Sequence, residues 1–338
     1  MAKVGIYGAS GYTGAELLRL CATHPDFDVA VATGDTQAGS AVASLYPSLA
    51  PAYGDLVFAE SSPGAVDGVD LLFLALPHGK AQAVVPELRG LVGAVVDLSA
   101  DFRLKDASLY PQWYGEEHHC PELLAEFVYG LPELFREQLV GSRLVAAPGC
   151  YVTAASLALT PLVRAGVIEA TGVIVDAASG VSGAGRGLKH SSSFCTVDED
   201  VTAYGLLDHR HTPEIEQVTG ARVLFTPHLV PMNRGILATC YARPTGATST
   251  EGLLDVLREA YDGEPFVVVS ERSPSTKATL GSNSCHLTAR FDERTGTVLV
   301  LSALDNLTKG ASGQAIQCAN LALGLPETSG LPQVGVYP

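Results

Sequence analysis

The stretch KVGIYGASGYTGAELLRLC, residues 3–21, decides the fold of the first half of the chain. Its apolar start, residues 3–7, predicts a strand, the glycines that follow predict a tight turn, and the run from residue 15 predicts a helix. Glycines in such a turn let backbone amides approach a pyrophosphate at the helix N-terminus. We therefore expect a dinucleotide here; the alternative is a tight turn without a ligand. The candidate cofactor-binding residues are Gly8, Ser10, Gly11, Tyr12, Thr13 and Gly14.

Further strands continue this pattern along the first half. Residues 27–31 predict a second strand, and the nearly continuous apolar runs at 70–76 and 93–98 predict parallel strands covered on both faces. Together they favour an open, doubly wound sheet, which binds ligands at the carboxyl edge of its strands. We expect Pro77 to contact the cofactor and Arg103 the substrate at this edge, whereas ordinary loop polarity is the alternative.

The residues after the second strand bear on the type of dinucleotide. Asp35 could accept hydrogen bonds from a ribose 2′-OH, which favours NAD, whereas Thr33 could contact a 2′-phosphate. No arginine lies between Arg19 and Arg89, so the usual arginine signature of NADP is absent from this loop. These residues leave the choice between NAD and NADP open.

One cysteine stands where a protein can activate a thiol. The run RLVAAPGCYVTAASLAL, residues 143–159, predicts a short strand, a Pro-Gly turn and a helix that opens at Thr153. Unpaired amides and the helix dipole at a helix N-terminus favour a thiolate, the nucleophilic form of cysteine. We predict that Cys150 is a catalytic nucleophile; the alternative is a small buried apolar residue.

A glycine-rich loop follows the next predicted strand, residues 172–178. The loop SGVSGAGR at 179–186 can present backbone amides to a ligand, although a flexible surface turn would have the same composition. Positive charge near it suits a phosphate or carboxylate. The candidate cofactor contacts are Ser179 and Gly180, and the candidate substrate contacts are Ser182 and Lys189.

The motif HRHTPEI at 209–215 supplies the candidate general base. A histidine near a thiol can take its proton and return one later in the reaction. Arg210 could hold an anion beside it. We expect Thr212 to cap a helix whose first turn contains a proline, so that the two histidine side chains diverge. Metal binding is not expected, because no nearby cysteine or acidic pair completes a tetrahedral site.

The C-terminal third predicts more strands and a final helix. Segments 266–269, 285–290 and 297–303 predict further strands of an open mixed sheet. The segment DNLTKGASGQ, residues 305–314, then leads into a helix with one apolar face. Asn306 and Lys309 in this lead-in are candidate cofactor contacts.

Length and charge limit the possible classes of protein. A chain of 338 residues exceeds a typical single core, so we expect two domains. The net charge of −15 disfavours nucleic acids and anionic membranes as partners. No apolar run is long enough to span a bilayer, and the N-terminus enters a strand at once, leaving no room for a signal peptide. Seven scattered cysteines without a C-x-x-C pair indicate a reducing, cytoplasmic environment.

The motifs together resemble one enzyme family, the N-acetyl-γ-glutamyl-phosphate reductases of arginine biosynthesis. They are individually weak, but they follow one another in the family's order along the whole chain. The matching pieces are GASGYTG at 8–14, LPHG at 76–79, DLSADFR at 97–103, YGLPEL at 129–134, PGCY at 148–151, SGVSGAGR at 179–186, HRHTPEI at 209–215 and DNLTKGASGQA at 305–315.

The resemblance implies an α/β protein with a Rossmann-like dinucleotide-binding domain and a catalytic α/β domain with a mixed sheet, as in semialdehyde dehydrogenases. It implies NADP(H) bound by residues 1–148 and 306–338, and a catalytic and oligomerisation domain at 149–305. It also implies a homodimer or homotetramer. In this reading an acyl phosphate forms a thioester on Cys150 and is reduced to a semialdehyde, with His209 as the base and Arg210 and His211 at the substrate.

Two other functions compete with this reading. The same chemistry could act on aspartyl phosphate or on a carrier-linked aminoadipyl phosphate; the motif set disfavours the first, and repulsion from an acidic carrier disfavours the second. A non-catalytic nucleotide-sensing regulator is the other alternative. The presence of Cys150, His209 and Arg210 together argues against it.

Overall fold

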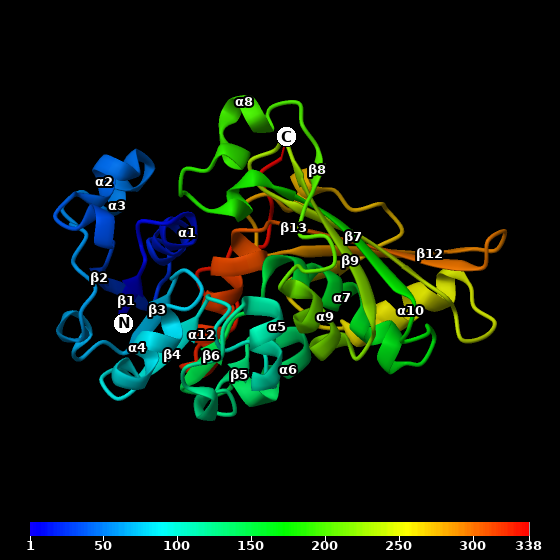
Figure 1. The fold of residues 1–338 in the computed structure, drawn as a ribbon, viewed down its shortest axis with the longest axis horizontal. Coiled ribbons are helices and arrows are strands. Elements are labelled where there is room, and N and C mark those ends of the chain that lie inside the picture. The colour runs from blue at the N-terminus through cyan, green and yellow to red at the C-terminus, as the bar shows by residue number, and fades with distance from the viewer. Residues whose placement is uncertain (338) are drawn as a thin grey trace. The chain divides into compact units, whose positions relative to one another are not determined.

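The computed structural model describes residues 1–337, which divide into two compact units. The first comprises Met1–Pro148 and Ala311–Leu331, and the second comprises Gly149–Gly310 and the tail from Pro332 onward. Figure 1 shows both units with their elements labelled. Within residues 1–337, none of the helices combines the length and the apolar character needed to cross a lipid bilayer.

The first unit is built on a parallel sheet. Its six strands are ordered β2-β1-β3-β4-β6-β5, and every pair in it is parallel. The strands are β1 (Ala2–Tyr7), β2 (Phe27–Ala32), β3 (Leu71–Leu74), β4 (Ala94–Asp97), β5 (Val128–Tyr129) and β6 (Leu144–Ala146). The helices are α1 (Tyr12–Cys21), α2 (Val42–Leu45), α3 (Ala50–Tyr53), α4 (Ala81–Leu88), α5 (Tyr110–Tyr114), α6 (Pro132–Leu139) and α12 (Gly313–Ala322). Every residue of β3 and β4 is buried, as their continuous apolar sequences predict.

The last helix, α12, belongs to the first unit although it comes from the far end of the chain. It packs against α6, β4 and α1. Its buried amide side chains fix it there: Gln314 Nε2 donates to the Gly130 carbonyl over 2.9 Å, and Asn320 Oδ1 lies 2.9 Å from His24 Nε2. These hydrogen bonds satisfy polar groups that burial would otherwise penalise, and they specify one docking position for the helix.

The second unit is built on a mixed sheet of seven strands in the order β11-β12-β13-β10-β7-β9-β8. The pairs β7–β9 and β11–β12 are parallel, and the other pairs are antiparallel. The strands are β7 (Val173–Gly180), β8 (Thr202–Ala203), β9 (Val223–Val230), β10 (Ile236–Ala242), β11 (Val267–Val269), β12 (Cys285–Asp292) and β13 (Thr297–Leu304). The helices are α7 (Cys150–Arg164), α8 (Phe194–Val197), α9 (His211–Thr219), α10 (Thr250–Ala260) and α11 (Thr276–Thr279). Helix α7 packs on β10 and β13, with α9 and α10 beside it.

The two sheets confirm the predicted fold class, a parallel Rossmann-like sheet and a separate mixed sheet. The predicted domain borders differ at the C-terminal end, because residues 306–310 and the tail from Pro332 pack within the second unit. There the Gly235 amide donates to Asn306 Oδ1 over 2.7 Å, and the Asn283 amide donates to the Pro332 carbonyl over 2.7 Å. The roles expected for the two domains stay predictions.

Candidate active site

The candidate nucleophile lies at the start of α7. Cys150 is the first residue of this helix of 15 residues and Gly149 is its N-cap, which confirms the predicted position at a helix N-terminus. The helix begins three residues before the predicted start at Thr153. Unpaired amides and the helix dipole at this end favour the thiolate. Cys150 is partly exposed, so the thiol combines access with a site that favours its reactive form.

Two residues of α9 hold the backbone immediately before Cys150. The Gly149 amide donates to Glu214 Oε1 over 3.0 Å, and Glu214 is fully buried. The imidazole of His211 lies so close that a Cβ on residue 149 would stand 2.3 Å from its Nε2. Only glycine fits between this ring and the start of α7. The ring therefore lies against the residue next to the nucleophile.

Glu214 was not among the residues predicted for the candidate active site. The signal was present in the motif, because residues three apart on a helix lie on the same face. His211 is the first residue of α9 and Glu214 the fourth, so both side chains point toward Gly149.

His209 occupies a different environment, an aromatic pocket. Its ring centroid lies 5.9 Å from that of Tyr151, 5.5 Å from that of Tyr204 and 5.2 Å from that of Phe225. Burial, reinforced by the charge of Arg210, lowers the pKa of His209 to about 4. The imidazole is therefore neutral at neutral pH, and only below about pH 4 would it become charged.

The start of α9 differs from the prediction. Thr212 is not the cap: the helix begins at His211 with Arg210 as N-cap and without a side-chain bond from the N-cap. Instead His209 Nδ1 accepts the His211 amide over 3.1 Å, so a histidine ring satisfies the first helical N–H. The two imidazoles also stay close, with centroids 4.7 Å apart. The imidazoles of His209 and His211 therefore lie close together but have different neighbours: His209 lies among aromatic rings, and His211 lies against Gly149.

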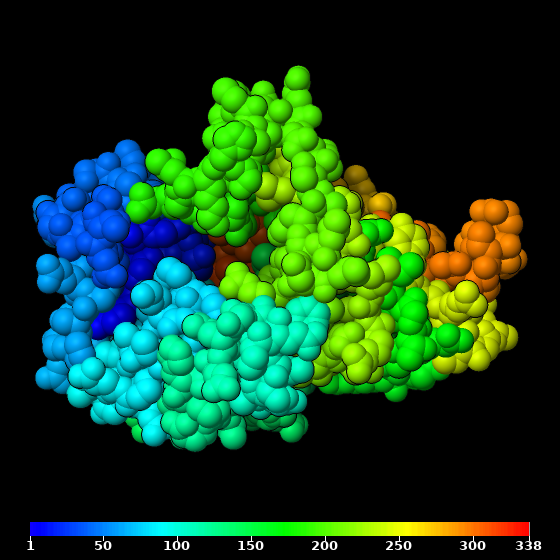
Figure 2. Space-filling model, in the orientation of Figure 1, coloured from blue at the N-terminus to red at the C-terminus, as the bar shows by residue number. Residues whose placement is uncertain are grey.

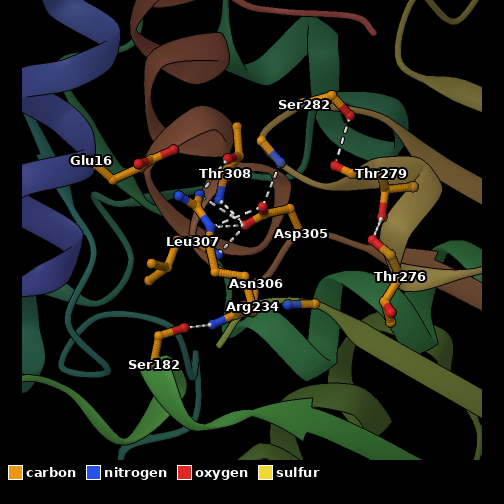
Figure 3. Close-up of polar contacts among 12 residues, drawn as sticks. Glu16, Ser182, Arg234, Thr276, Thr279, Ser282, Asp305, Asn306, Leu307 and Thr308 are labelled. Atoms are coloured by element: carbon orange, nitrogen blue, oxygen red, sulfur yellow. Dashed lines mark hydrogen bonds and ion pairs between the residues drawn. The ribbon is translucent and has the colours of Figure 1, made fainter. Parts of the chain in front are cut away.

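The glycine-rich loop and the end of β13 meet through one amide side chain. Asn306 Nδ2 donates to Ser182 Oγ over 2.9 Å, and Asn306 Oδ1 accepts the Gly235 amide (Figure 3). A Cβ on Gly180 would stand 2.8 Å from the backbone of Asn233. The loop and the backbone after β9 therefore pack so closely that a side chain does not fit at position 180. Two predicted ligand contacts, Ser182 and Asn306, thus belong to one site.

Two predicted contacts, Thr33 and Arg103, are buried and hydrogen-bond within the first unit. Thr33 is fully buried, and its Oγ1 lies 2.8 Å from Ser61 Oγ and accepts the Gly8 amide. Arg103 donates to two backbone carbonyls, over 2.8 Å to Ala147 and 2.7 Å to Leu98. The contacts of Thr33 with the cofactor and of Arg103 with the substrate stay predictions.

Lys309 is likewise fully buried, with its Nζ 5.7 Å from the centroid of the Phe266 ring. The packing of Phe266 against the ammonium group is a cation–π contact. It anchors the segment after β13 within the second unit. Ser179 is also buried, and it donates its hydroxyl to the Gly180 carbonyl over 3.1 Å.

Two positively charged candidates are accessible. Lys189 and Arg210 are exposed, Lys189 before a short helical turn and Arg210 at the N-cap of α9. Figure 2 shows the green segment around α8, which follows Lys189, projecting from the surface of the second unit. Both side chains lie at the surface, where an anion can approach them.

The turn after β1 in the first unit fits a dinucleotide. Gly8 has a φ of +77°, and a Cβ there would stand 2.3 Å from the Ala75 carbonyl oxygen. A Cβ on Gly14 would stand 2.4 Å from the Ala9 Cα, so the turn packs tightly against α1. Gly11 is the N-cap of α1 and has no such neighbour at close range. This leaves the amides at the start of α1 open to a pyrophosphate.

The other residues predicted around this turn also lie at its open side. Tyr12, the first residue of α1, and Pro77 are exposed, whereas Ser10 and Thr13 are half-buried. The loops after β3 and β4 meet, as their position at one sheet edge predicts: His78 Nδ1 lies 2.7 Å from Asp101 Oδ1. Among residues 1–337, no group of three or more His, Cys, Asp or Glu side chains is arranged to hold a metal ion.

Comparison with known proteins defines the class first. Residues 3–142 match the semialdehyde dehydrogenase NAD binding domain, and residues 150–306 match the semialdehyde dehydrogenase dimerisation domain. Aspartate semialdehyde dehydrogenase II from Vibrio cholerae, complexed with ASA, has the same fold, with a TM-score of 0.72 at 16% identity over 96% of this chain and 98% of that one. Aspartate semialdehyde dehydrogenase with NADP from Candida albicans gives a TM-score of 0.71 at 17% identity, over 95% and 98% of the two chains. The protein is an oxidoreductase of this class with a nicotinamide dinucleotide cofactor.

The particular family follows from closer relatives. N-acetyl-gamma-glutamyl-phosphate reductase from Symbiobacterium thermophilum is 52% identical over 99% of both chains. The protein of the same name from Citrifermentans bemidjiense is 49% identical over 100% of both. This chain belongs to the N-acetyl-γ-glutamyl-phosphate reductase family, as the sequence resemblance predicted.

The environment of each thiol predicts an order of chemical labelling. Burial raises the pKa of Cys21 and Cys240 to about 12 and that of Cys120 to about 11, so these thiols react slowly. Iodoacetamide at pH 7 should modify Cys150 first, because the start of α7 favours its thiolate. Cys195 is the only competitor for access among the described residues, since it is exposed. Peptide mapping over time measures the order.

The matched control is Cys195→Ser, which should leave the labelling rate of Cys150 unchanged. Labelling of Cys195 ahead of Cys150 in the parent protein would contradict the activation of Cys150 by its helix.

Proposed function

We propose that this protein catalyses the NADPH-dependent reduction of N-acetyl-glutamyl 5-phosphate to N-acetyl-glutamate 5-semialdehyde and phosphate, a step of arginine biosynthesis. The observation that carries the proposal is Cys150 at the start of α7, next to a glycine held by His211 and Glu214. The family supports the same substrate, since relatives 52% and 49% identical over nearly the whole chain bear its name.

The first step is acyl transfer to Cys150. Its thiolate attacks the acyl carbon, a C–S bond forms, and the bond from that carbon to the phosphate oxygen breaks. Inorganic phosphate leaves with the electron pair, and the acyl group remains as a thioester. The helix N-terminus stabilises the attacking thiolate, and the exposed charges of Lys189 and Arg210 favour the anionic substrate.

His211 is the better candidate for proton transfer. Its ring lies against Gly149, beside the nucleophile, whereas His209 uses Nδ1 to accept the His211 amide and has a pKa lowered to about 4. A group that titrates so far below neutral pH is a poor proton donor there. This geometry favours an exchange of the roles expected from the sequence. His211 takes the thiol proton and holds it beside the acyl oxygen, and His209 supports His211.

The amides at the start of α1, with Gly8, Gly11 and Gly14, would hold the pyrophosphate of NADPH. When bound, the dihydronicotinamide would supply a hydride to the carbonyl carbon of the thioester. The C–S bond would then break, which releases the semialdehyde and returns the Cys150 thiolate. The preference for NADPH over NADH rests on the family resemblance, because the segment 33–40 after β2 contains no arginine.

A homo-oligomer formed through the second unit completes the proposal. Leu224 pairs with Ile174 and Ile174 with Tyr241 across three neighbouring strands, and all three side chains are exposed. An apolar strip on one sheet face is typical of an interaction surface. The matching family model for residues 150–306 is a dimerisation domain, which supports a contact between copies of this chain.

Replacing the nucleophile tests the proposed chemistry. Cys150→Ser should lower turnover with N-acetyl-glutamyl phosphate by at least ~10³-fold, because a serine hydroxyl is a far weaker nucleophile near neutral pH. NADPH affinity should change less than about threefold, because the turn that holds the pyrophosphate belongs to the other unit. Oxidation of NADPH followed at its absorbance band and equilibrium binding of NADPH give the two values.

Cys195→Ser serves as the control and should retain full turnover. Activity of Cys150→Ser within tenfold of the parent would exclude covalent catalysis through this residue. Aspartyl phosphate and a carrier-linked aminoadipyl phosphate are assayed beside the main substrate, and faster turnover of either would reassign the substrate.

The two histidines are separated by a pair of matched variants. His211→Asn should lower kcat by about 10²–10⁴-fold, the usual loss for a missing general acid or base. His209→Asn should lower kcat less than about tenfold and leave the acid limb of the kcat/KM profile above pH 5 unchanged, because His209 already has a pKa of about 4.

Melting temperatures of both variants report their folding. A larger loss of kcat in His209→Asn, with folding intact, would return the base to His209 and contradict the assignment to His211.

A further inference from the structure

One carboxylate organises the segment that follows β13. Asp305 is fully buried, and its oxygens accept the amides of Gly281 over 2.7 Å, Leu307 over 2.9 Å and Thr308 over 3.1 Å. The guanidinium of Arg234 donates to it through Nε over 3.1 Å and through Nη2 over 3.0 Å (Figure 3). A buried carboxylate with these partners is paired and fully hydrogen-bonded, which is the condition for keeping a charge away from water.

Arg234 also reaches the far side of the same turn. Its Nη2 donates to Thr308 Oγ1 over 2.9 Å, so one guanidinium connects both ends of the segment 305–308. The ion pair thus sets the path of the backbone on either side of Asn306.

The first end of the turn presents a hydroxyl group. Asn306 Oδ1 accepts the Gly235 amide over 2.7 Å, which fixes the orientation of the amide side chain. Its Nδ2 then donates to Ser182 Oγ over 2.9 Å. Because that oxygen accepts from the amide, the Ser182 hydroxyl is left to donate its proton to another group. Ser182 is half-buried, so a ligand can reach it.

The second end of the turn lies on the nucleophile. The Gly310 amide donates to the Asp305 carbonyl oxygen over 2.9 Å and closes the turn. A Cβ on Gly310 would stand 2.8 Å from the Cβ of Cys150 and 3.3 Å from its Cα. The turn 305–310 therefore touches Cys150 at one end and holds Ser182 at the other.

We propose that Arg234 and Asp305 are positioning residues for the reductase reaction. Their ion pair fixes the turn 305–310, which aims the Ser182 hydroxyl at an oxygen of the bound acyl phosphate and sets the access of that substrate to Cys150. The inference deepens the proposed function and rests on it. Neither side chain is assigned a contact with the substrate.

Stability of the fold alone would not require the ion pair between Arg234 and Asp305. A buried ion pair is often replaced by packed apolar side chains without loss of stability. Apolar side chains could not accept the amides of Gly281, Leu307 and Thr308, which Asp305 gathers at one point. The arrangement therefore specifies the conformation of the turn.

The test uses Arg234→Met, which keeps an unbranched apolar stem but removes the guanidinium, and Asp305→Asn, which keeps the shape of the side chain but removes its charge. Both should lower kcat by about 10–10²-fold, the scale of loss when reacting groups are displaced by about 1 Å. Alkylation of Cys150 by iodoacetamide, measured without substrate, should become at least about threefold faster, because the turn no longer shields the thiol. Ser182→Ala should lose kcat but keep the parent's alkylation rate.

Arg136→Met is the matched control. Arg136 forms an ion pair with Glu327 over 3.0 Å inside the first unit, and neither residue is assigned a part in the reaction. It should lower the melting temperature while leaving kcat and the alkylation rate within about twofold of the parent.

The proposal is overturned if Arg234→Met and Asp305→Asn behave like Arg136→Met, with lower melting temperatures but unchanged kcat and alkylation. If either variant fails to fold, Arg234→Lys decides: it should fall between the parent and Arg234→Met in kcat, and an unchanged kcat and alkylation rate would refute the proposal. The alkylation readout needs no substrate, so it also separates this proposal from the proposed function. The parent protein could fail to reduce the substrate while both variants show the predicted faster alkylation of Cys150. That result would contradict the proposed reaction but support the positioning role of Arg234 and Asp305.

Discussion

The second unit depends on one constraint, the fixed start of helix α7. Gly149 has a carboxylate on its amide and an imidazole against its Cα, both supplied by α9. Because Cys150 is the next residue, the same contacts that hold the helix also set the position of the thiol. A helix N-terminus offers a thiolate a favourable electrostatic environment only if it is held in place, and here the second helix does this. The turn 305–310 packs on the same cysteine from another side.

In the first unit, close packing likewise fixes the backbone, here at the turn after β1. Its turn after β1 is tight because Gly8 and Gly14 leave no space for a side chain, so the amides at the start of α1 stay in a fixed arrangement. Thr33 supports this turn from within the unit, and Arg103 supports the chain at Ala147. In both units, buried polar side chains hold the backbone so that a few exposed groups can act on ligands.

Much of this could be predicted from the sequence, because the relevant signals are local. The strand-turn-helix of residues 3–21, the buried strands β3 and β4, and the position of Cys150 at a helix start all follow from short-range patterns. The central strands β9 and β10 were not predicted: a proline lies inside the first, and the small residues Ala238, Thr239 and Ala242 weaken the apolar signal of the second. Sequence patterns identified Thr33, Arg103 and Lys309 as polar, but could not show that each is buried by residues distant in the chain. For the same reason Arg234 was not predicted, since its partner Asp305 lies 71 residues away.

The central claim is that Cys150 carries the acyl group as a thioester. The most direct measurement mixes the enzyme with N-acetyl-glutamyl phosphate in the absence of any nicotinamide cofactor, quenches the reaction in acid, and analyses both phosphate and protein. The account predicts a burst of phosphate equal in amount to the enzyme and an N-acetylglutamyl adduct confined to the peptide that contains Cys150. Phosphate release that occurs only when NADPH is present, or an adduct on any other residue, would contradict it.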